Sequence, residues 1–184
     1  MARPLRQELA GGIFHVYARG NRKQRIFFDD RDRRTYMTLL SRTVRRRRWH
    51  CLGYCLMTTH VHLILETPEP NLGVGMQHFH GPFAHLLNKR HGLTGHAFEG
   101  RFHSPLITSD EQLWMTARYL ALNPVEAGLV KIAEMYKWSS HAAIVTGRPP
   151  AFLAVDRLLA HFGDEDDGFA RYRRFVDSTI PKGV

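Results

Sequence analysis

The sequence predicts an α+β fold in which helices pack against an antiparallel sheet, and three observations support this class. Stretches with alternating apolar residues, typical of strands, follow one another along the chain with stretches of helical periodicity between them. Two of the strand-like stretches are separated by only two residues, which predicts a tight antiparallel pair. Hydrophobic residues make up 43% of the 184 residues, enough for one domain with a core of its own.

The first half of the chain is expected to form a strand, a helix and a hairpin. Residues 12–19 alternate as a strand does and are followed by a Gly-Asn turn. A helix begins at Asp29-Asp30 and extends to about residue 45, because its apolar residues recur at helical spacing. Residues 49–57 and 60–66 then form the two strands of the hairpin.

The second half adds two helices and one strand. Asn71 can cap a helix that extends to about residue 91, and residues 96–108 are expected to form a strand or bent ribbon. A third helix covers about residues 110–122 and stops at Asn123-Pro124, since proline disfavours helical geometry in the residue before it. The order β-α-β-β-α-β-α matches the ferredoxin-like arrangement, an antiparallel sheet with two helices on one face.

The remaining residues are expected to complete the same structure. Residues 125–150 contain several glycines and prolines and form short turns, while residues 155–162 and 168–177 form two C-terminal helices. We therefore expect one functional domain over residues 1–150 and a helical extension over residues 151–184 that packs on it. The histidines outside the motifs below are expected on polar helix faces or in turns; they include His78, His80, His85, His91 and His96.

The charge of the chain points to a polyanionic partner. The 26 Lys and Arg residues against 17 Asp and Glu residues give a net charge of +9, and residues 1–50 alone carry 14 basic and 4 acidic residues. A concentrated basic surface binds phosphates and releases counterions, so nucleic acid is the first partner to consider. The run Arg45, Arg46, Arg47 and Arg48 is one candidate surface, although such a run can also be a solvated helix face.

Other classes fit less well. The basic stretch lacks a clean apolar face for a membrane surface, and the N-terminus lacks the apolar region of a secretory signal, so we expect a cytoplasmic protein that does not bind membranes. The two cysteines, Cys51 and Cys55, are too few for a disulfide scaffold. Their spacing on a strand, about 13 Å, is too long for both to bind one ion, and we expect core thiols.

A histidine pair provides the first candidate site. His60 and His62 lie at positions i and i+2 of a strand, so both imidazoles point from the same face, at about the spacing that one metal ion can bridge. Val61, Leu63 and Leu65 then face the core. The pair alone is weak evidence, because such histidines are more often structural than metal-binding.

A tyrosine and an asparagine on the third helix strengthen the prediction. Tyr119 and Asn123 are four residues apart and therefore share one face of that helix. An amide oxygen with two imidazoles makes a set of ligands suited to Mg²⁺ or Mn²⁺, beside which a phenol can attack a phosphate. Each residue also has a structural alternative: Tyr119 can be a core aromatic, and Asn123-Pro124 can be only a helix stop.

Several motifs together resemble the single-tyrosine HUH transposases, and especially the REP-associated tyrosine transposases of bacteria. The resemblance covers residues 12–147. The stretches that carry it are HVYARGNRKQRIFFDDRDR (15–33), YCLMTTHVHLILETPEPNL (54–72), GHAFEGRFHS (95–104), ARYLALNPVEAGLV (117–130) and KWSSHAAIVTG (137–147). Their joint order and spacing are much more specific than the histidine pair alone.

The resemblance implies a DNA strand transferase. It makes His60 and His62 metal ligands, Asn123 the third ligand and Tyr119 the nucleophile. Members of the family cleave single-stranded DNA through a 5′-phosphotyrosine, leave a free 3′-OH and recognise hairpins of palindromic repeats. The implied partner is hairpin or single-stranded DNA in the bacterial nucleoid, the implied cofactor is Mg²⁺ or Mn²⁺, no nucleotide cofactor is needed, and the protein is a monomer or homodimer.

Four arginines near the motifs are the remaining candidates for DNA contact. Arg19, Arg22, Arg25 and Arg101 flank glycine-containing turns, and we favour phosphate contact over simple solvation for them. The sequence departs from the family pattern at three positions, because His103 replaces a lysine, Glu99 a glutamine and Ala121 a histidine.

A non-catalytic alternative stays open. The same residues are compatible with a domesticated protein that binds structured nucleic acid as a repressor without turnover.

Overall fold

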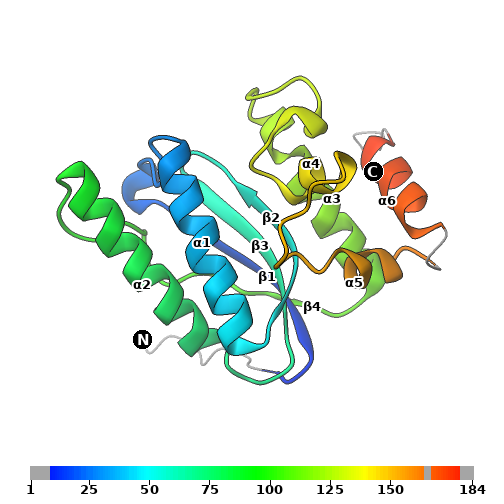
Figure 1. Cartoon of the computed structure of the whole chain (residues 1–184), viewed down its shortest axis with the longest axis horizontal. Coiled ribbons are helices and arrows are strands. Elements are labelled where there is room, and N and C mark those ends of the chain that lie inside the picture. Colours follow the sequence, from blue (N-terminus) through cyan, green and yellow to red (C-terminus); the bar gives the residue numbers. More distant parts are fainter. Residues whose placement is uncertain (1–8, 164–166, 179–184) are drawn as a thin grey trace.

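The computed structural model describes residues 9–163 and 167–178, and its centre is a four-stranded antiparallel sheet (Figure 1). The strands are β1 (Gly12–Arg19), β2 (His50–Leu56), β3 (His60–Thr67) and β4 (Leu106–Ile107), in the spatial order β2-β3-β1-β4. β2 and β3 form the predicted hairpin. The predicted α+β class with its antiparallel sheet is confirmed.

Two long helices, α1 (Asp30–Arg47) and α2 (Leu72–His91), lie side by side across one face of the sheet (Figure 1). The alternation of the strands provides the apolar surface for them. In β1, Phe14 and Val16 are fully buried, whereas the alternate residues Ile13, His15 and Tyr17 are only half-buried. Tyr36 of α1 packs its ring against Phe79 and Phe83 of α2, which joins the two helices within the core.

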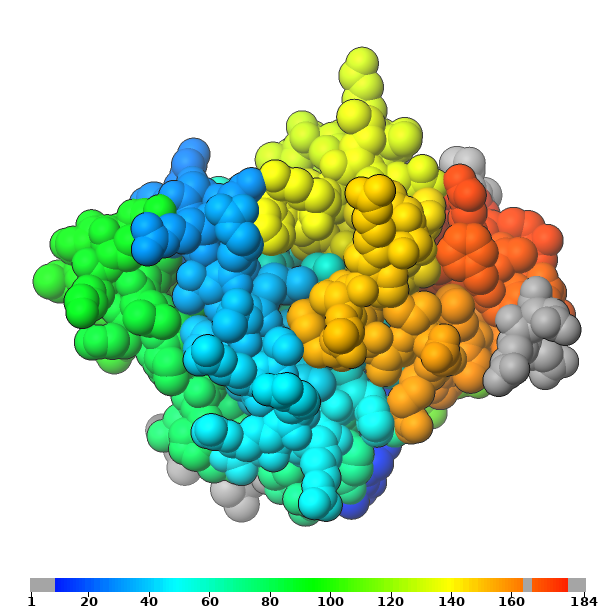
Figure 2. All heavy atoms as spheres, in the orientation of Figure 1, coloured from blue at the N-terminus to red at the C-terminus, as the bar shows by residue number. Residues whose placement is uncertain are grey.

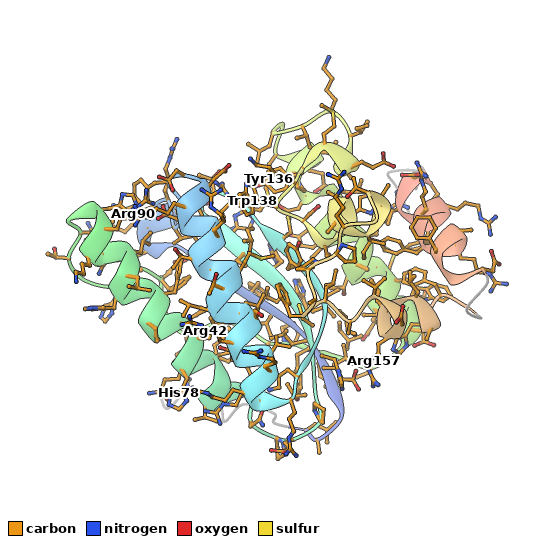
Figure 3. The ribbon with its side chains drawn as sticks, viewed as in Figure 1. Arg42, His78, Arg90, Tyr136, Trp138 and Arg157 are labelled. Carbon is orange, nitrogen blue, oxygen red and sulfur yellow. The ribbon has the colours of Figure 1, made fainter. Side chains whose placement is uncertain are left out.

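Charged side chains hold the beginning of α1 in place. The carboxylate of Asp29 caps the helix by accepting from the backbone N–H groups of Arg31 and Asp32. Arg90, labelled at the end of α2 in Figure 3, pairs with both Asp29 and Asp32. This ion pair keeps the pKa of Asp29 well below its usual value.

The third helix is longer than the sequence predicts. α3 covers Asp110–Glu126, so it continues through Asn123-Pro124, and the prediction that it stops there is wrong. A proline removes one N–H donor but not the carbonyl acceptors around it. The backbone N–H groups of Ala127 and Leu129 bond to the carbonyls of Asn123 and Pro124, which completes the last turn.

The segment before α3 forms less strand than expected. Of residues 96–108, only β4 is a regular strand, and its two residues pair with Ile13 and Phe14. Isolated bridges join Phe98 to Gly20 and His103 to Tyr17. The segment is therefore an irregular ribbon along β1, in agreement with the bent ribbon that the sequence allows.

The C-terminal third packs around α3 and the outer edge of β2. It contains a short 3-10 turn (Ala133–Met135), α4 (Ser140–Val145), α5 (Val155–Ala160) and α6 (Gly168–Asp177). Another 3-10 turn, Asn21–Lys23, follows β1. Arg118 of α3 is buried and donates to the carbonyl of Phe175 and to Ser178, so α6 is fixed to α3.

Within the described residues, no helix has the length and apolar character needed to cross a membrane.

Two predictions about single residue types have different outcomes. Cys51 and Cys55 are buried free thiols, as expected for core residues. His80 is not on a polar face as expected: it is buried, its Nε2 lies 3.0 Å from the hydroxyl of Tyr36, and its ring stacks on Phe98. Burial lowers the pKa of His80 to about 3, so it is a neutral member of the core.

We expect Gly75→Ala to destabilise the protein by about 1–3 kcal/mol, although alanine is the better helix former. A Cβ atom at Gly75 would overlap the rigid ring of Trp49, at the contact between α2 and the start of β2. Chemical denaturation of Gly75→Ala, Trp49→Leu and the double variant measures this clash. In the Trp49→Leu background, the alanine should be neutral or stabilising; an equal loss in both backgrounds would contradict this explanation.

Candidate active site

The pairing of β1 with β3 gathers polar side chains on the face of the sheet opposite α1 and α2. In the antiparallel register, Tyr17 lies across from His62 and Arg19 lies across from His60. His15 is on the same face, and its Nε2 lies 3.0 Å from Nδ1 of His62. The apolar neighbours of these residues in sequence point into the core on the other side.

Helix α3 crosses this face and brings Tyr119 and Asn123 to the histidines. Oδ1 of Asn123 lies 3.3 Å from Nε2 of His60. The ring of Tyr119 stands edge-on to the ring of His62, with the centroids 5.1 Å apart, and to the ring of His15 at 6.0 Å. The structure therefore brings together the four residues that the sequence predicts as ligands and nucleophile.

Tyr119 and the three histidines border a cavity of about 580 Å³ between the sheet, α3 and the ribbon before β4. Tyr119 is 41% exposed and Asn123 is 7% exposed, so the phenol reaches solvent while the amide is buried. The residues that line the cavity are His15, Tyr17, Ala18, Arg19, His60, His62, Glu99, Gly100, Arg101, His103 and Tyr119.

Burial keeps the imidazoles of this cluster neutral. It lowers the pKa of His62 to about 3, with further contributions from the neighbouring His15 and His60, and it lowers the pKa of His15 to about 4. The pKa of His60 is also lowered by burial. Neutral imidazoles have a free lone pair, which is the form that binds a metal ion.

The nitrogens of the two histidines have different partners. Nδ1 of His62 faces His15, which leaves Nε2 of that ring for an ion. In His60, Nδ1 lies 3.1 Å from the hydroxyl of Thr59 and Nε2 faces Oδ1 of Asn123, so an ion would replace the contact between Nε2 and Oδ1. The 3.3 Å between Nε2 of His60 and Oδ1 of Asn123 is close to the ~3 Å that separates neighbouring ligands of an octahedral ion with bonds of about 2.1 Å. The spacing therefore allows both atoms to bind one ion, and Mg²⁺ or Mn²⁺ stays a prediction.

A metal ion at this site would need Asn123 as its third protein ligand. Among the residues that the structure describes, no three His, Cys, Asp or Glu side chains are close enough to hold a metal ion together. Two imidazoles and one amide oxygen leave the other positions of a six-coordinate ion for water or phosphate oxygens.

The predicted DNA-contacting arginines do not form one surface. Arg19 and Arg101 line the cavity. Arg22 and Arg25 are exposed in the turn that follows β1, outside the lining of the cavity. The run Arg45–Arg48 lies on the opposite face of the sheet from the cavity, where α1 ends and the chain turns into β2.

Sequence reasoning missed His15 and Tyr17 as site residues. The signal was present, because His15, Tyr17 and Arg19 are spaced by two on a predicted strand, as His60 and His62 are. Which face of β1 meets α3 depends on the pairing register, which the sequence does not show.

The departures from the family pattern have separate locations. His103 stacks on the ring of Tyr17, with the centroids 4.7 Å apart, and Glu99 lies at the cavity wall. Ala121 is buried and is not part of the cavity lining. Its small side chain is therefore part of the core contact of α3.

The fold and the cavity define a class: a ferredoxin-like domain whose sheet presents a histidine pair to a tyrosine and an asparagine of one helix. Neither a protein-family model nor a curated protein matches the chain. A solved structure of a REP-associated tyrosine transposase bound to a REP hairpin matches with a TM-score of 0.68 and 19% sequence identity, covering 84% of this chain and 92% of that one. The fold that the motifs imply is therefore confirmed, and this neighbour belongs to the family that the motifs resemble.

In the metal-free protein, the rings of His15 and His62 should stay neutral from about pH 7.5 down to about pH 5. Burial places their pKa values at about 4 and about 3, against the ordinary 6.5. Nitrogen-15 NMR of the imidazoles across this range is the measurement. A protonation step near pH 6.5 at either ring would show that the cluster is more hydrated than its burial implies.

Proposed function

We propose that this protein cleaves and rejoins single-stranded DNA beside a hairpin, with Tyr119 as the nucleophile. The observation that carries the proposal is the position of Tyr119 against His62, at the mouth of a cavity that also holds His60, Arg19 and Arg101. The fold shared with a hairpin-bound transposase supports DNA as the substrate. The motifs that resemble that family support the chemistry.

In the proposed reaction, the phenolic oxygen of Tyr119 attacks the phosphorus of a DNA phosphodiester. A bond forms between that oxygen and phosphorus, the bond from phosphorus to the 3′ oxygen breaks, and the 3′ oxygen takes a proton. Because Tyr119 is half exposed at the cavity mouth, its own proton can pass to water. The phosphotyrosine retains the energy of the phosphodiester, so rejoining by a 3′-OH needs no nucleotide cofactor.

The chain's own residues would bind and orient the phosphate. Arg19 extends from the end of β1 and Arg101 from the ribbon, so their guanidinium groups approach the cavity from two elements. Mg²⁺ or Mn²⁺ held by His60, His62 and Asn123 would draw charge from the phosphate oxygens and make phosphorus easier to attack. Burial supports this role, because it keeps both histidines neutral.

Replacing Tyr119 with phenylalanine should abolish the covalent protein–DNA adduct, because it removes only the attacking oxygen. Hairpin affinity and stability should change little, since the side chain is partly exposed and its ring is retained. The measurement is incubation with hairpin-bearing single strands and Mn²⁺, followed by denaturing electrophoresis and mass spectrometry of the adduct.

Tyr17→Phe is the matched control, because Tyr17 is the other phenol that lines the cavity. Its adduct should still form and map to Tyr119. An adduct on another tyrosine would contradict the mechanism. Nicking without an adduct would favour a simple nuclease, and hairpin binding without cleavage in the wild-type protein would favour the non-catalytic repressor.

His15 also belongs to the proposed site, as a positioning residue for His62. If Nδ1 of His62 carries the proton and donates to Nε2 of His15 across their 3.0 Å separation, Nε2 of His62 has its lone pair free for the metal ion. The usual acceptor behind a ligating histidine is a carboxylate, a carbonyl or water. A neutral imidazole in that place adds no negative charge beside a cavity that must accept phosphate.

We expect His15→Phe to weaken Mn²⁺ binding by about 10- to 100-fold, because the acceptor for His62 is lost. His15→Gln should bind within a few-fold of the wild type, since its amide oxygen can replace Nε2 as acceptor. Electron paramagnetic resonance measures the concentration of free Mn²⁺ in a titration, and the double variant His60→Ala/His62→Ala shows the signal expected when the site is lost. Wild-type affinity in His15→Phe would show that His15 does not position the ligand.

A further inference from the structure

The exposed side of α1 carries a line of arginines that the proposed reaction does not use. Successive members of the line are three, eight and three residues apart, which is close to one or two turns of the helix, so they fall on one face. At 1.5 Å per residue the line is about 21 Å long. Its members are Arg31, Arg34, Arg42 and Arg45, with Arg46 beside the last, and all are exposed. We call this surface the arginine face.

The charges of the arginine face are not neutralised by the protein. Within residues 9–163 and 167–178, no ion pair or side-chain hydrogen bond is found for any of its five guanidinium groups. The nearby acids at the start of α1 already have partners, because Asp29 pairs with Arg90 and Asp30 pairs with Lys137. Five uncompensated charges on one helix repel each other, which is tolerated when a polyanion binds them.

The arginine face lies in the other layer from the candidate active site. α1 packs its buried side, with Tyr36 and Leu40, on the apolar face of the sheet, whereas His60 and His62 project from the opposite face toward α3. Figure 2 views the molecule from the side of α1, whose blue to cyan atoms lie uncovered at the front. Arg42 is labelled on this helix in Figure 3.

We infer that the arginine face is a second nucleic-acid surface, which binds the phosphate backbone of double-stranded DNA while a single strand occupies the cavity of the other layer. The inference rests on the proposed function for the nature of the partner. Arg binds phosphate oxygens through its planar fork of donors, and duplex DNA offers one charge per about 1.7 Å of axis. A line of about 21 Å matches about six base pairs.

The chemistry of the face favours a duplex over an unpaired strand. Proteins that hold single strands combine positive charge with aromatic side chains on which the bases stack. The side chains between the arginines are small and polar, among them Thr35 and Thr38, and the exposed side of α1 has no aromatic residue. The face can therefore bind the backbone but has nothing on which to stack a base.

The same composition argues against an anionic membrane. A helix that binds at a lipid surface inserts apolar side chains beside its basic ones. Leu40 and Val44 of α1 are buried, and the half-buried Met37 and Leu39 pack against the core, so the helix offers no exposed apolar side chain to lipid. Duplex DNA is thus the better match for a face with charge alone.

The first test measures how salt weakens binding of a blunt mixed-sequence duplex of about 20 base pairs to the full chain. Arg34→Gln/Arg42→Gln should reduce the slope of log K against log salt by about 1.8, because each lost phosphate contact removes about 0.9. Lys131→Gln/Arg148→Gln is the control with the same change of charge at two exposed residues elsewhere, and its slope should match the wild type. Circular dichroism checks that both variants fold.

The second test uses the wild-type protein and asks whether two DNA segments bind together. A labelled single strand of about 8 nucleotides, at saturation, should leave the duplex bound, giving a ternary complex by analytical ultracentrifugation. Three results would each overturn the inference: displacement of the duplex, equal slopes in the two double variants, or binding to anionic phospholipid vesicles in place of the duplex. Neither test measures cleavage, so a failure of this inference is distinct from a missing adduct at Tyr119.

Discussion

The antiparallel pairing of β1 with β3 is the constraint on which the rest of the structure depends. It places Tyr17 across from His62 and Arg19 across from His60, with His15 in hydrogen-bonding distance of His62. Because side chains alternate along a strand, a shift of this register by one residue would turn the histidines into the core and the apolar residues to the cavity. The buried face of the sheet thus fixes the geometry of the polar face, since the two cannot move independently.

The fixed sheet would not make a site without a fixed α3. Two polar interactions, five residues apart on this helix, help to hold it: Asn123 contacts His60 on the cavity side, and Arg118 holds the end of α6 on the other side. The buried guanidinium group donates to the carbonyl of Phe175 and to the hydroxyl of Ser178 at the end of α6. The C-terminal helices therefore contribute to the site by holding the helix that carries Tyr119, although none of their residues lines the cavity.

Much of this arrangement could be predicted from the sequence, and the parts that could not have identifiable causes. The strands, the hairpin and the shared face of His60 and His62 follow from local periodicity, and the position of Tyr119 beside Asn123 follows from helical spacing. The predicted end of α3 was wrong, because the local rule for proline is overridden when packing holds the helix and the carbonyls of Asn123 and Pro124 accept hydrogen bonds that complete its last turn. The predicted exposure of His80 was also wrong, because its hydrogen-bonding partner Tyr36 is 44 residues away in the sequence and local periodicity does not reveal it. His15 was missed because its role depends on strand register.

The distribution of charge separates the molecule into two layers with different properties. The histidines beside Tyr119 are neutral because they are desolvated, so positive charge near the cavity comes from Arg19 and Arg101 at its border. The larger excess of positive charge is on α1, where it stays hydrated and adds nothing to the cost of burying the core. Charge in contact with solvent can attract a polyanion at long range, whereas neutral ligands in a desolvated cluster can bind an ion without first losing protons. This separation agrees with the proposed function, in which one side of the sheet collects DNA and the other acts on a single phosphate of it.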